Sequence, residues 1–244
     1  VAEPAQIWTY GQFMADFQFK IQSFDWSGME FRLKTPLGVY DVKSPLLGTH
    51  NVYNAVSAII AAWLAGISFE KSIEALKTFT GVPGRLQKVN SDRVNIFVDY
   101  AHTPDALEKV LIILGDLRNQ ISEKSEIWCV FGCGGDRDKG KRPLMTRVAA
   151  QFADHVVLTS DNPRTENPES ILNDMEQGIK AERKGRIIRE VDRKKAITLA
   201  LSRAKPQDVI LIAGKGHENY QIAGTTKIDF DDYKLATQIE KGIS

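Results

Sequence analysis

Residues 131–143, FGCGGDRDKGKRP, contain the glycines and lysines of a phosphate-binding loop. The G-x-x-x-x-G-K spacing is that of a nucleotide P-loop, but such a loop needs Ser or Thr after its lysine to ligate magnesium, and Arg142 stands there. A dinucleotide fingerprint would need its third glycine where Arg137 stands. The loop therefore predicts neither a triphosphate cradle nor a dinucleotide site.

Four polar loops, of which this is one, each follow a short apolar run. The runs cover residues 94–98, 127–131, 156–159 and 209–213. They are apolar without alternation and are separated by helical segments, which is typical of a mainly parallel sheet covered on both faces. Loops that follow parallel strands leave one edge of the sheet, where ligands bind at the point at which the strand order reverses. We therefore expect the four loops to form one binding crevice.

The side chains of these loops suit a ligand that carries both charges. Arg137 and Arg164 have planar guanidinium groups that pair with carboxylates. Asp161 and Glu218 can accept hydrogen bonds from an ammonium group, and the amide of Asn162 can serve either charge. The composition predicts an amino-acid ligand. The alternative, that these charges only form salt bridges between loops, stays open from the sequence.

The bulk composition limits the other partners. The 244 residues include 32 Lys and Arg against 31 Asp and Glu, so no net field attracts nucleic acid or an anionic membrane. No apolar run reaches the roughly 18 residues of a membrane span, and no signal-peptide pattern opens the sequence. Cys129 and Cys133 lack zinc-site spacing, which favours a reducing compartment. We expect a cytoplasmic protein without nucleic-acid or membrane partners.

The first part of the chain has a different rhythm. Residues 16–45 alternate polar and apolar side chains between turn residues, which predicts short antiparallel strands. The apolar stretch 51–66 predicts a buried helix, and Ser68 predicts the N-cap of a second one. The stretch TGVPGR, residues 80–85, is typical of a linker or hinge. Because the first residue is Val1 rather than Met, we expect the sequence to begin inside a longer protein.

Six stretches carry a resemblance to a known family. In chain order they read GTHNVYNAVSA, GVPGRLQ, VDYAHTPDALEKVL, FGCGGDRDKGKRPLM, TSDNPRTENP and AGKGHENYQI. Together they resemble the Mur ligases, and within that family the members that add the third peptide residue of the peptidoglycan precursor. The resemblance implies an α/β fold. Its Rossmann-like C-terminal domain, with a mainly parallel sheet, would cover residues 85–244, preceded over residues 1–84 by the C-terminal portion of an α/β central ATPase domain.

The same resemblance implies an activity and its cofactors. Family members use ATP with Mg²⁺ to convert the carboxylate of UDP-N-acetylmuramoyl-L-alanyl-D-glutamate to an acyl phosphate, which the incoming amino acid attacks. The DNPR sequence at 161–164 resembles members that take meso-diaminopimelate. The P-loop, the carbamylated lysine and the magnesium ligands lie upstream in the family. We therefore assign no catalytic or metal-ligating residue in this chain and expect it to be inactive alone.

Position by position, the resemblance implies two sets of binding residues. The nucleotide set is Asn51, Asn54, Arg85, Asp99, Tyr100 and His102. The amino-acid set is Arg137, Asp161, Asn162, Arg164, Gly214 and Glu218. The glycine-rich loop is thus expected to hold a carboxylate through Arg137 rather than a phosphate, and we expect a monomer that acts on small-molecule substrates.

Other functions stay open from the sequence. The isolated chain could be a non-enzymatic module that binds an amino acid or a nucleotide, or part of a related Mur ligase that adds L-lysine. A dinucleotide-dependent oxidoreductase is disfavoured, because Arg137 occupies the position of the third glycine and no acidic ribose contact is identifiable.

Overall fold

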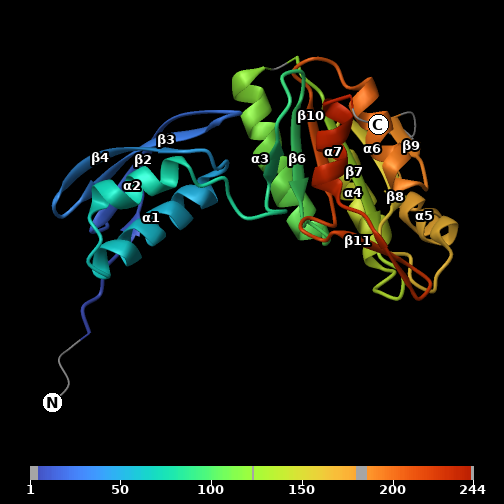
Figure 1. Ribbon diagram of the computed structural model, residues 1–244, viewed down its shortest axis with the longest axis horizontal. Helices are drawn as coiled ribbons and strands as arrows, with labels where there is room; N and C mark the ends of the chain where they lie inside the picture. Colours follow the sequence, from blue (N-terminus) through green and yellow to red (C-terminus); the bar gives the residue numbers. More distant parts are fainter. Residues whose placement is uncertain (1–4, 123, 180–185, 243–244) are drawn as a thin grey trace. The chain divides into compact units, whose positions relative to one another are not determined.

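The computed structural model describes residues 5–122, 124–179 and 186–242, and Figure 1 traces the chain through them. They fall into two compact units, Val1–Gly81 and Val82–Ser244. The division lies inside the 80–85 stretch that has the composition of a linker. The domain boundary expected after residue 84, and a hinge movement at this stretch, stay predictions.

The first unit combines a four-stranded sheet with two helices. Its elements are β1 (Tyr10–Gly11), β2 (Phe17–Asp25), β3 (Gly28–Thr35), β4 (Gly38–Ser44), α1 (Thr49–Leu64) and α2 (Phe69–Lys77). β2, β3 and β4 pair antiparallel, which confirms the prediction from alternation, and β1 pairs parallel with β2. Ser68 caps α2, as expected, because its side chain accepts a hydrogen bond from Lys71 N.

The helices of this unit cover one face of its sheet (Figure 1). Phe31 and Leu33 of β3 are fully buried, while Arg32 between them is exposed, so the strand has one core face and one solvent face. The rings of Trp63 and Phe69 stack with centroids 5.6 Å apart beneath them. This aromatic core lies within the first unit.

A six-stranded sheet forms the centre of the second unit. Its strands are β5 (Gln87–Val89), β6 (Asn95–Asp99), β7 (Ile127–Cys133), β8 (His155–Ser160), β9 (Ile187–Arg189) and β10 (Val209–Ala213). The order across the sheet is β5-β6-β10-β7-β8-β9, and every pairing is parallel except that of β5 with β6. The four apolar runs predicted to be strands of a mainly parallel sheet are confirmed.

The position of β10 decides where the loops meet. From β6 the chain passes to β7, β8 and β9 in one direction, then returns to fill the gap between β6 and β7 with β10. Because β6, β7, β8 and β10 are parallel, the loops after them leave the same edge of the sheet. The strand order reverses at β10, which is where open α/β sheets bind ligands.

Helices cover both faces of this sheet. They are α3 (Pro104–Ile121), α4 (Lys141–Phe152), α5 (Pro168–Glu176), α6 (Arg193–Arg203) and α7 (Asp232–Glu240). α3, α4 and α5 contact one another in sequence, whereas α6 pairs with α7. Ile96 and Ile210 pack with α6 and α7, and the alternate residues Phe97 and Leu211 are equally buried on the other face. Among the described residues, no helix has the length and apolar character needed to cross a membrane.

A fully buried ion pair joins these helices to the carboxyl edge of the sheet. Arg193 and Asp232 have side chains that are 0% exposed, and Arg193 Nε and Nη2 donate to the two carboxylate oxygens of Asp232 at 2.8 and 2.7 Å. The same guanidinium donates to the carbonyl oxygens of Ala213, at 3.0 Å, and Ser160, at 3.4 Å. Since Ser160 and Ala213 end β8 and β10, Arg193 fixes two strand ends from which the polar loops depart.

A second buried arginine occupies the position at which a P-loop would have Ser or Thr. Arg142 is 0% exposed and donates to Glu166 at 2.8 and 2.9 Å and to Asp174 at 2.8 Å. Glu166 also accepts a hydrogen bond from Asp136 N at 2.6 Å. The hydrogen bonds from Arg142, followed by the bond from Asp136, lower the pKa of Glu166 to about 2. Arg142 and Glu166 thereby tie together the loops after β7 and β8.

The Arg193–Asp232 pair predicts a large loss of stability when one partner is removed. In Asp232→Ala a buried guanidinium would lack its counter-charge, which costs about 3 to 5 kcal/mol. Hydrogen exchange of the β10 amides in increasing urea would measure the loss. Lys109→Ala is a matched control, because the Lys109–Asp105 pair is 70% and 75% exposed and its removal should cost about 1 kcal/mol or less. Equal losses in both variants would contradict the assignment.

Glu166 predicts a pH dependence of stability. Its folded-state pKa of about 2 lies below the ordinary value of 4.5, so its contribution is present above pH 4.5 and is lost as the pH falls to about 2. We expect Glu166→Gln to be less stable than the native chain at neutral pH and the difference to narrow through this window. Urea midpoints measured at several pH values would check it; a difference that does not change with pH would show that the carboxylate charge is unimportant.

Candidate functional site

The glycine-rich loop packs against the loop that follows β8. Gly135 N donates to the carbonyl oxygen of Asn162 at 2.9 Å, and a Cβ on Gly135 would lie 1.9 Å from the carbonyl oxygen of Pro163. Asp136 accepts a hydrogen bond from the Thr165 hydroxyl at 2.7 Å. Only glycine permits this approach of two backbones. The glycines that resemble a phosphate cradle therefore serve a contact between loops.

Arg164 is held in an unusual backbone conformation. Its φ is 50°, in the left-handed region that side chains other than glycine seldom adopt. Its backbone is fixed by Arg164 N donating to the Ile222 carbonyl at 3.0 Å and by Gly224 N donating to the Arg164 carbonyl at 2.7 Å. The partners flank the turn of a hairpin formed by β11 (Tyr220–Ala223) and β12 (Thr226–Asp229).

Gly134 brings the two predicted carboxylate-binding arginines together. A Cβ on Gly134 would lie 2.9 Å from Arg164 Nη1 and 3.7 Å from Arg137 Cγ, so both side chains run past this glycine. Arg164 Nη1 donates to the Gly135 carbonyl at 2.8 Å, while Arg137 is exposed. The pair could present guanidinium groups to one anionic ligand from two different loops.

The loop after β8 also contributes Asp161 and Asn162 to an acidic cluster. Asn162 Nδ2 donates to Glu218 Oε2 at 3.0 Å, and Asp161 lies beside them with its side chain 13% exposed. The cluster centres on Lys215, whose ammonium lies 3.0 Å from Asp161 and 3.8 Å from Glu218. Gly214, the first residue after β10, is buried with φ 110° and links this loop to β6 by donating to the Asp99 carbonyl at 3.0 Å.

Lys215 is the functional candidate that sequence reasoning missed. Its side chain is 0% exposed, although a lysine between two glycines suggests a solvated loop. The one local signal is its position directly after an apolar strand, where Gly214 and Gly216 both have positive φ and let the backbone fold tightly. Two of its partners, Asn162 and Asp161, are 53 or more positions away in the sequence, so nothing local in the sequence identifies them.

The predicted nucleotide contacts of the second unit gather at the end of β6. The Tyr100 ring lies 4.6 Å from that of His102 and 5.2 Å from that of His217, and the Arg85 guanidinium lies 5.2 Å from its centroid. Asp99 is 6% exposed and accepts hydrogen bonds from backbone N–H groups of the two segments that flank this group, at 2.7 and 2.8 Å. Exposed Arg85 and His102 form a cationic and aromatic surface with the half-buried Tyr100, whereas Asp99 supports the backbone beneath it.

Asn51 and Asn54 lie in the first unit, on α1. Asn54 Nδ2 donates to Asn51 Oδ1 at 3.1 Å, and Asn51 Nδ2 donates to the Leu47 carbonyl at 2.7 Å. The two amides are therefore neighbours on one face of the helix. They form a pair separate from the four nucleotide candidates of the second unit.

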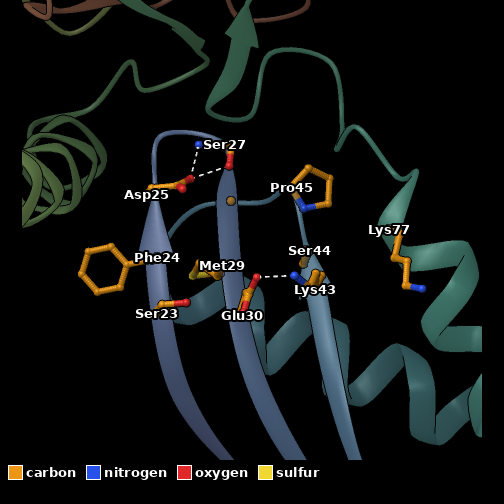
Figure 2. Close-up of a pocket in the computed structure, with 11 residues that line it drawn as sticks. Ser23, Phe24, Asp25, Ser27, Met29, Glu30, Lys43, Ser44, Pro45 and Lys77 are labelled. Atoms are coloured by element: carbon orange, nitrogen blue, oxygen red, sulfur yellow. Dashed lines mark hydrogen bonds and ion pairs between the residues drawn. The ribbon is translucent and has the colours of Figure 1, made fainter.

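The first unit also has a hollow of about 330 Å³, drawn in Figure 2. The β2–β3 turn, the end of β4 and Lys77 of α2 line it. Glu30 and Lys43 pair at 2.6 Å, and Asp25 accepts a hydrogen bond from Ser27 N at 2.6 Å, so polar groups at this wall bond to one another. None of the residues that line it belongs to the predicted sets.

The charges at the sheet edge form salt bridges only in part. Arg142 is paired with two carboxylates, those of Glu166 and Asp174. Lys215, however, faces both Asp161 and Glu218, which leaves the cluster with an excess of negative charge. Within residues 5–122, 124–179 and 186–242, no group of three or more His, Cys, Asp and Glu side chains is arranged to hold a metal ion. The arrangement suits an organic cation next to a carboxylate.

Comparison with known families matches both parts of the chain. Residues 84–216 match the family described as Mur ligase, glutamate ligase domain, and residues 2–62 match the Mur ligase middle domain. The UDP-N-acetylmuramoyl-L-alanyl-D-glutamate--2,6-diaminopimelate ligase of Prochlorococcus marinus is 48% identical over 214 residues, which cover 87% of this chain and 41% of that protein.

Further relatives have the same name. The corresponding ligase of Thermosynechococcus vestitus is 48% identical over 233 residues, 94% of this chain and 46% of that protein. A solved structure of a UDP-N-acetylmuramoyl-L-alanyl-D-glutamate--2,6-diaminopimelate ligase matches with a TM-score of 0.74 at 42% identity, covering 97% of this chain and 48% of that one. The chain thus spans less than half the length of these relatives, and the expected α/β fold is confirmed. On these matches, the chain belongs to the Mur ligase family.

Proposed function

We propose that this chain supplies the amino-acid site, and part of the nucleotide site, of an ATP-dependent ligase that joins meso-diaminopimelate to UDP-N-acetylmuramoyl-L-alanyl-D-glutamate. The observation that carries the proposal is that the loop after β8 contributes both to the pair of arginines beside Gly134 and to the acidic cluster around Lys215. A cation pair next to excess negative charge complements the carboxylate and ammonium of an amino acid.

The amino-acid site would divide its work between the two charges. Arg164 and Arg137 would bind a carboxylate, and Glu218 and Asp161 would bind the neighbouring ammonium. Asn162 is 4% exposed, and its amide is committed to protein partners on both sides, so it would orient Glu218. Gly214 would leave room for the ligand at the end of β10.

The nucleotide site would use the surface at the end of β6. ATP, with Mg²⁺, supplies the phosphoryl group that activates the carboxylate of the dipeptide. Tyr100 and His102 would contact the nucleotide through their rings, and Arg85 would pair with a phosphate. For Asn51 and Asn54, in the first unit, contact with the adenine is proposed on the family resemblance alone. The proposal assigns no Mg²⁺ ligand to these residues.

Meso-diaminopimelate is favoured over lysine as the ligand because of charge. Meso-diaminopimelate has one more carboxylate than lysine, at the far end of the molecule. The cation of Arg164 would pair with that carboxylate, whereas lysine would bring only an ammonium group to it. A monomer in the cytoplasm, where ATP and amino acids are available, is part of the same proposal. A module that binds the amino acid without ligation is the second candidate, favoured by the amino-acid set lying entirely in the second unit.

Arg164→Ala should separate the two amino acids. Loss of a guanidinium from a desolvated carboxylate costs about 2 to 5 kcal/mol, so we expect at least about a tenfold loss of affinity for meso-diaminopimelate. Lysine affinity should change less than about twofold, because lysine lacks that carboxylate. Ligand-observed NMR titration of the 244-residue chain would measure both, with Arg203→Ala on α6 as an exposed control. Equal losses for both amino acids would mean that Arg164 only supports the loop.

The chain by itself should not turn over ATP. Its nearest P-loop match has Arg142 instead of Ser or Thr, and this arginine is buried against Glu166. Phosphoryl transfer needs positioned magnesium and phosphate-binding groups, which the resemblance to the Mur ligases implies lie upstream of this chain. We expect no phosphate release above background from purified chain with ATP, Mg²⁺ and both substrates. Release that follows the chain through further purification would contradict this.

A further inference from the structure

Lys215 is a cation without solvent contact at the edge where the loops meet. Its Nζ donates to the Tyr220 carbonyl at 2.7 Å and to Asn162 Oδ1 at 3.0 Å. Tyr220 begins the β11–β12 hairpin, and Asn162 belongs to the loop after β8. One ammonium group therefore joins the loop after β10 to two other pieces of the site.

The ammonium leaves the carboxylates around it incompletely satisfied. A lysine has three N–H donors, and two of them are used on the neutral oxygens of Tyr220 and Asn162. Asp161 Oδ1 and Glu218 Oε2 lie 3.0 and 3.8 Å from the ammonium. Asp161 Oδ1 is buried and lies outside hydrogen-bond geometry with Lys215, and no other donor of the described residues satisfies it. A buried carboxylate oxygen without a donor is costly unless a ligand supplies one.

Lys215 also decides how the amide of Asn162 is oriented. Asn162 Oδ1 accepts hydrogen bonds from Lys215 Nζ at 3.0 Å and from Ile222 N at 2.9 Å, and both of these groups can only donate. Asn162 Nδ2 must then point to Glu218, to which it donates at 3.0 Å. A side chain without charge and N–H donors at position 215 would remove one of the two hydrogen bonds that fix this orientation.

We propose that Lys215 is a positioning residue that holds Asp161, Asn162 and Glu218 in place and leaves the cluster one negative charge, so that it accepts one ammonium group of an amino acid. This inference rests on the proposed amino-acid site. One lysine between two carboxylates gives the cluster the charge that a single ammonium neutralises. A cluster with both carboxylates and no lysine would hold two like charges close together, which is unfavourable.

The arrangement predicts that two harmful substitutions compensate each other. Lys215→Met keeps a long side chain but leaves two carboxylates without their cation. Asp161→Asn keeps the shape but makes the cluster neutral, so that it no longer attracts an ammonium. The double variant Lys215→Met, Asp161→Asn again has one negative charge, on Glu218. We expect each single variant to bind meso-diaminopimelate and lysine at least about tenfold more weakly, and the double variant to bind both more tightly than either single variant.

Binding and unfolding together make the test decisive. Titrations of both amino acids into the native 244-residue chain and the three variants give the affinities, and thermal unfolding without ligand shows which variants are folded. Losses that add in the double variant would overturn the charge balance that we assign to Lys215, and unchanged binding by folded Lys215→Met would overturn its positioning role. Both outcomes leave the proposed function intact. Absence of binding by the native chain would count against the proposed function. In that case thermal unfolding of the native chain and the three variants still tests the inference. The double variant, whose charge is balanced, should be more stable than Lys215→Met. Losses of stability that add in the double variant would overturn the inference.

Discussion

The carboxyl edge of the second sheet depends on cations that have no contact with solvent. Arg193 pairs with Asp232 and bonds to the last carbonyl groups of β8 and β10, so the strand ends, α6 and α7 are fixed by one guanidinium. A buried charge is tolerated only with such partners, because the cost of removing it from water exceeds any single hydrogen bond. Every loop of the candidate site starts from an edge that this pair makes rigid.

Glycines then determine how closely the loops approach. The loops after β7 and β8 touch through Gly135, and the loop after β10 touches the end of β6 through Gly216, where a Cβ would lie 2.7 Å from Tyr100 Cβ. Arg142 and Glu166 lock the first of these contacts. A motif that resembles a phosphate cradle in sequence has become a scaffold that presents Arg137 and Arg164. The same residue types thus serve a different chemistry because the backbone N–H groups face another loop.

The candidate site combines buried, hydrogen-bonded side chains with others that the protein pairs only in part. Asn162, Lys215 and Asp99 are buried and hydrogen-bonded. The side chains around them are more exposed, namely those of Arg137, Glu218, Tyr100 and His102. The strained φ of Arg164 belongs to the same pattern, since the hairpin bonds on both sides of it maintain the conformation. If the proposed site binds an amino acid, we expect it to discriminate by charge, because its supporting groups are already committed to protein partners.

The sequence by itself determined the local elements and the residue types of the site. Apolar runs predicted β6, β7, β8 and β10, and Ser68 predicted a helix N-cap that the structure confirms, because propensity, periodicity and capping act within a few residues. The short strands β5 and β9 and the β11–β12 hairpin escaped it, since they have few residues and depend on neighbouring strands. Only the tertiary structure placed β10 between β6 and β7, buried Arg142, and made Lys215 the centre of the acidic cluster. Whether a charged side chain is solvated or buried depends on partners brought together by the chain fold, and local sequence carries no record of them.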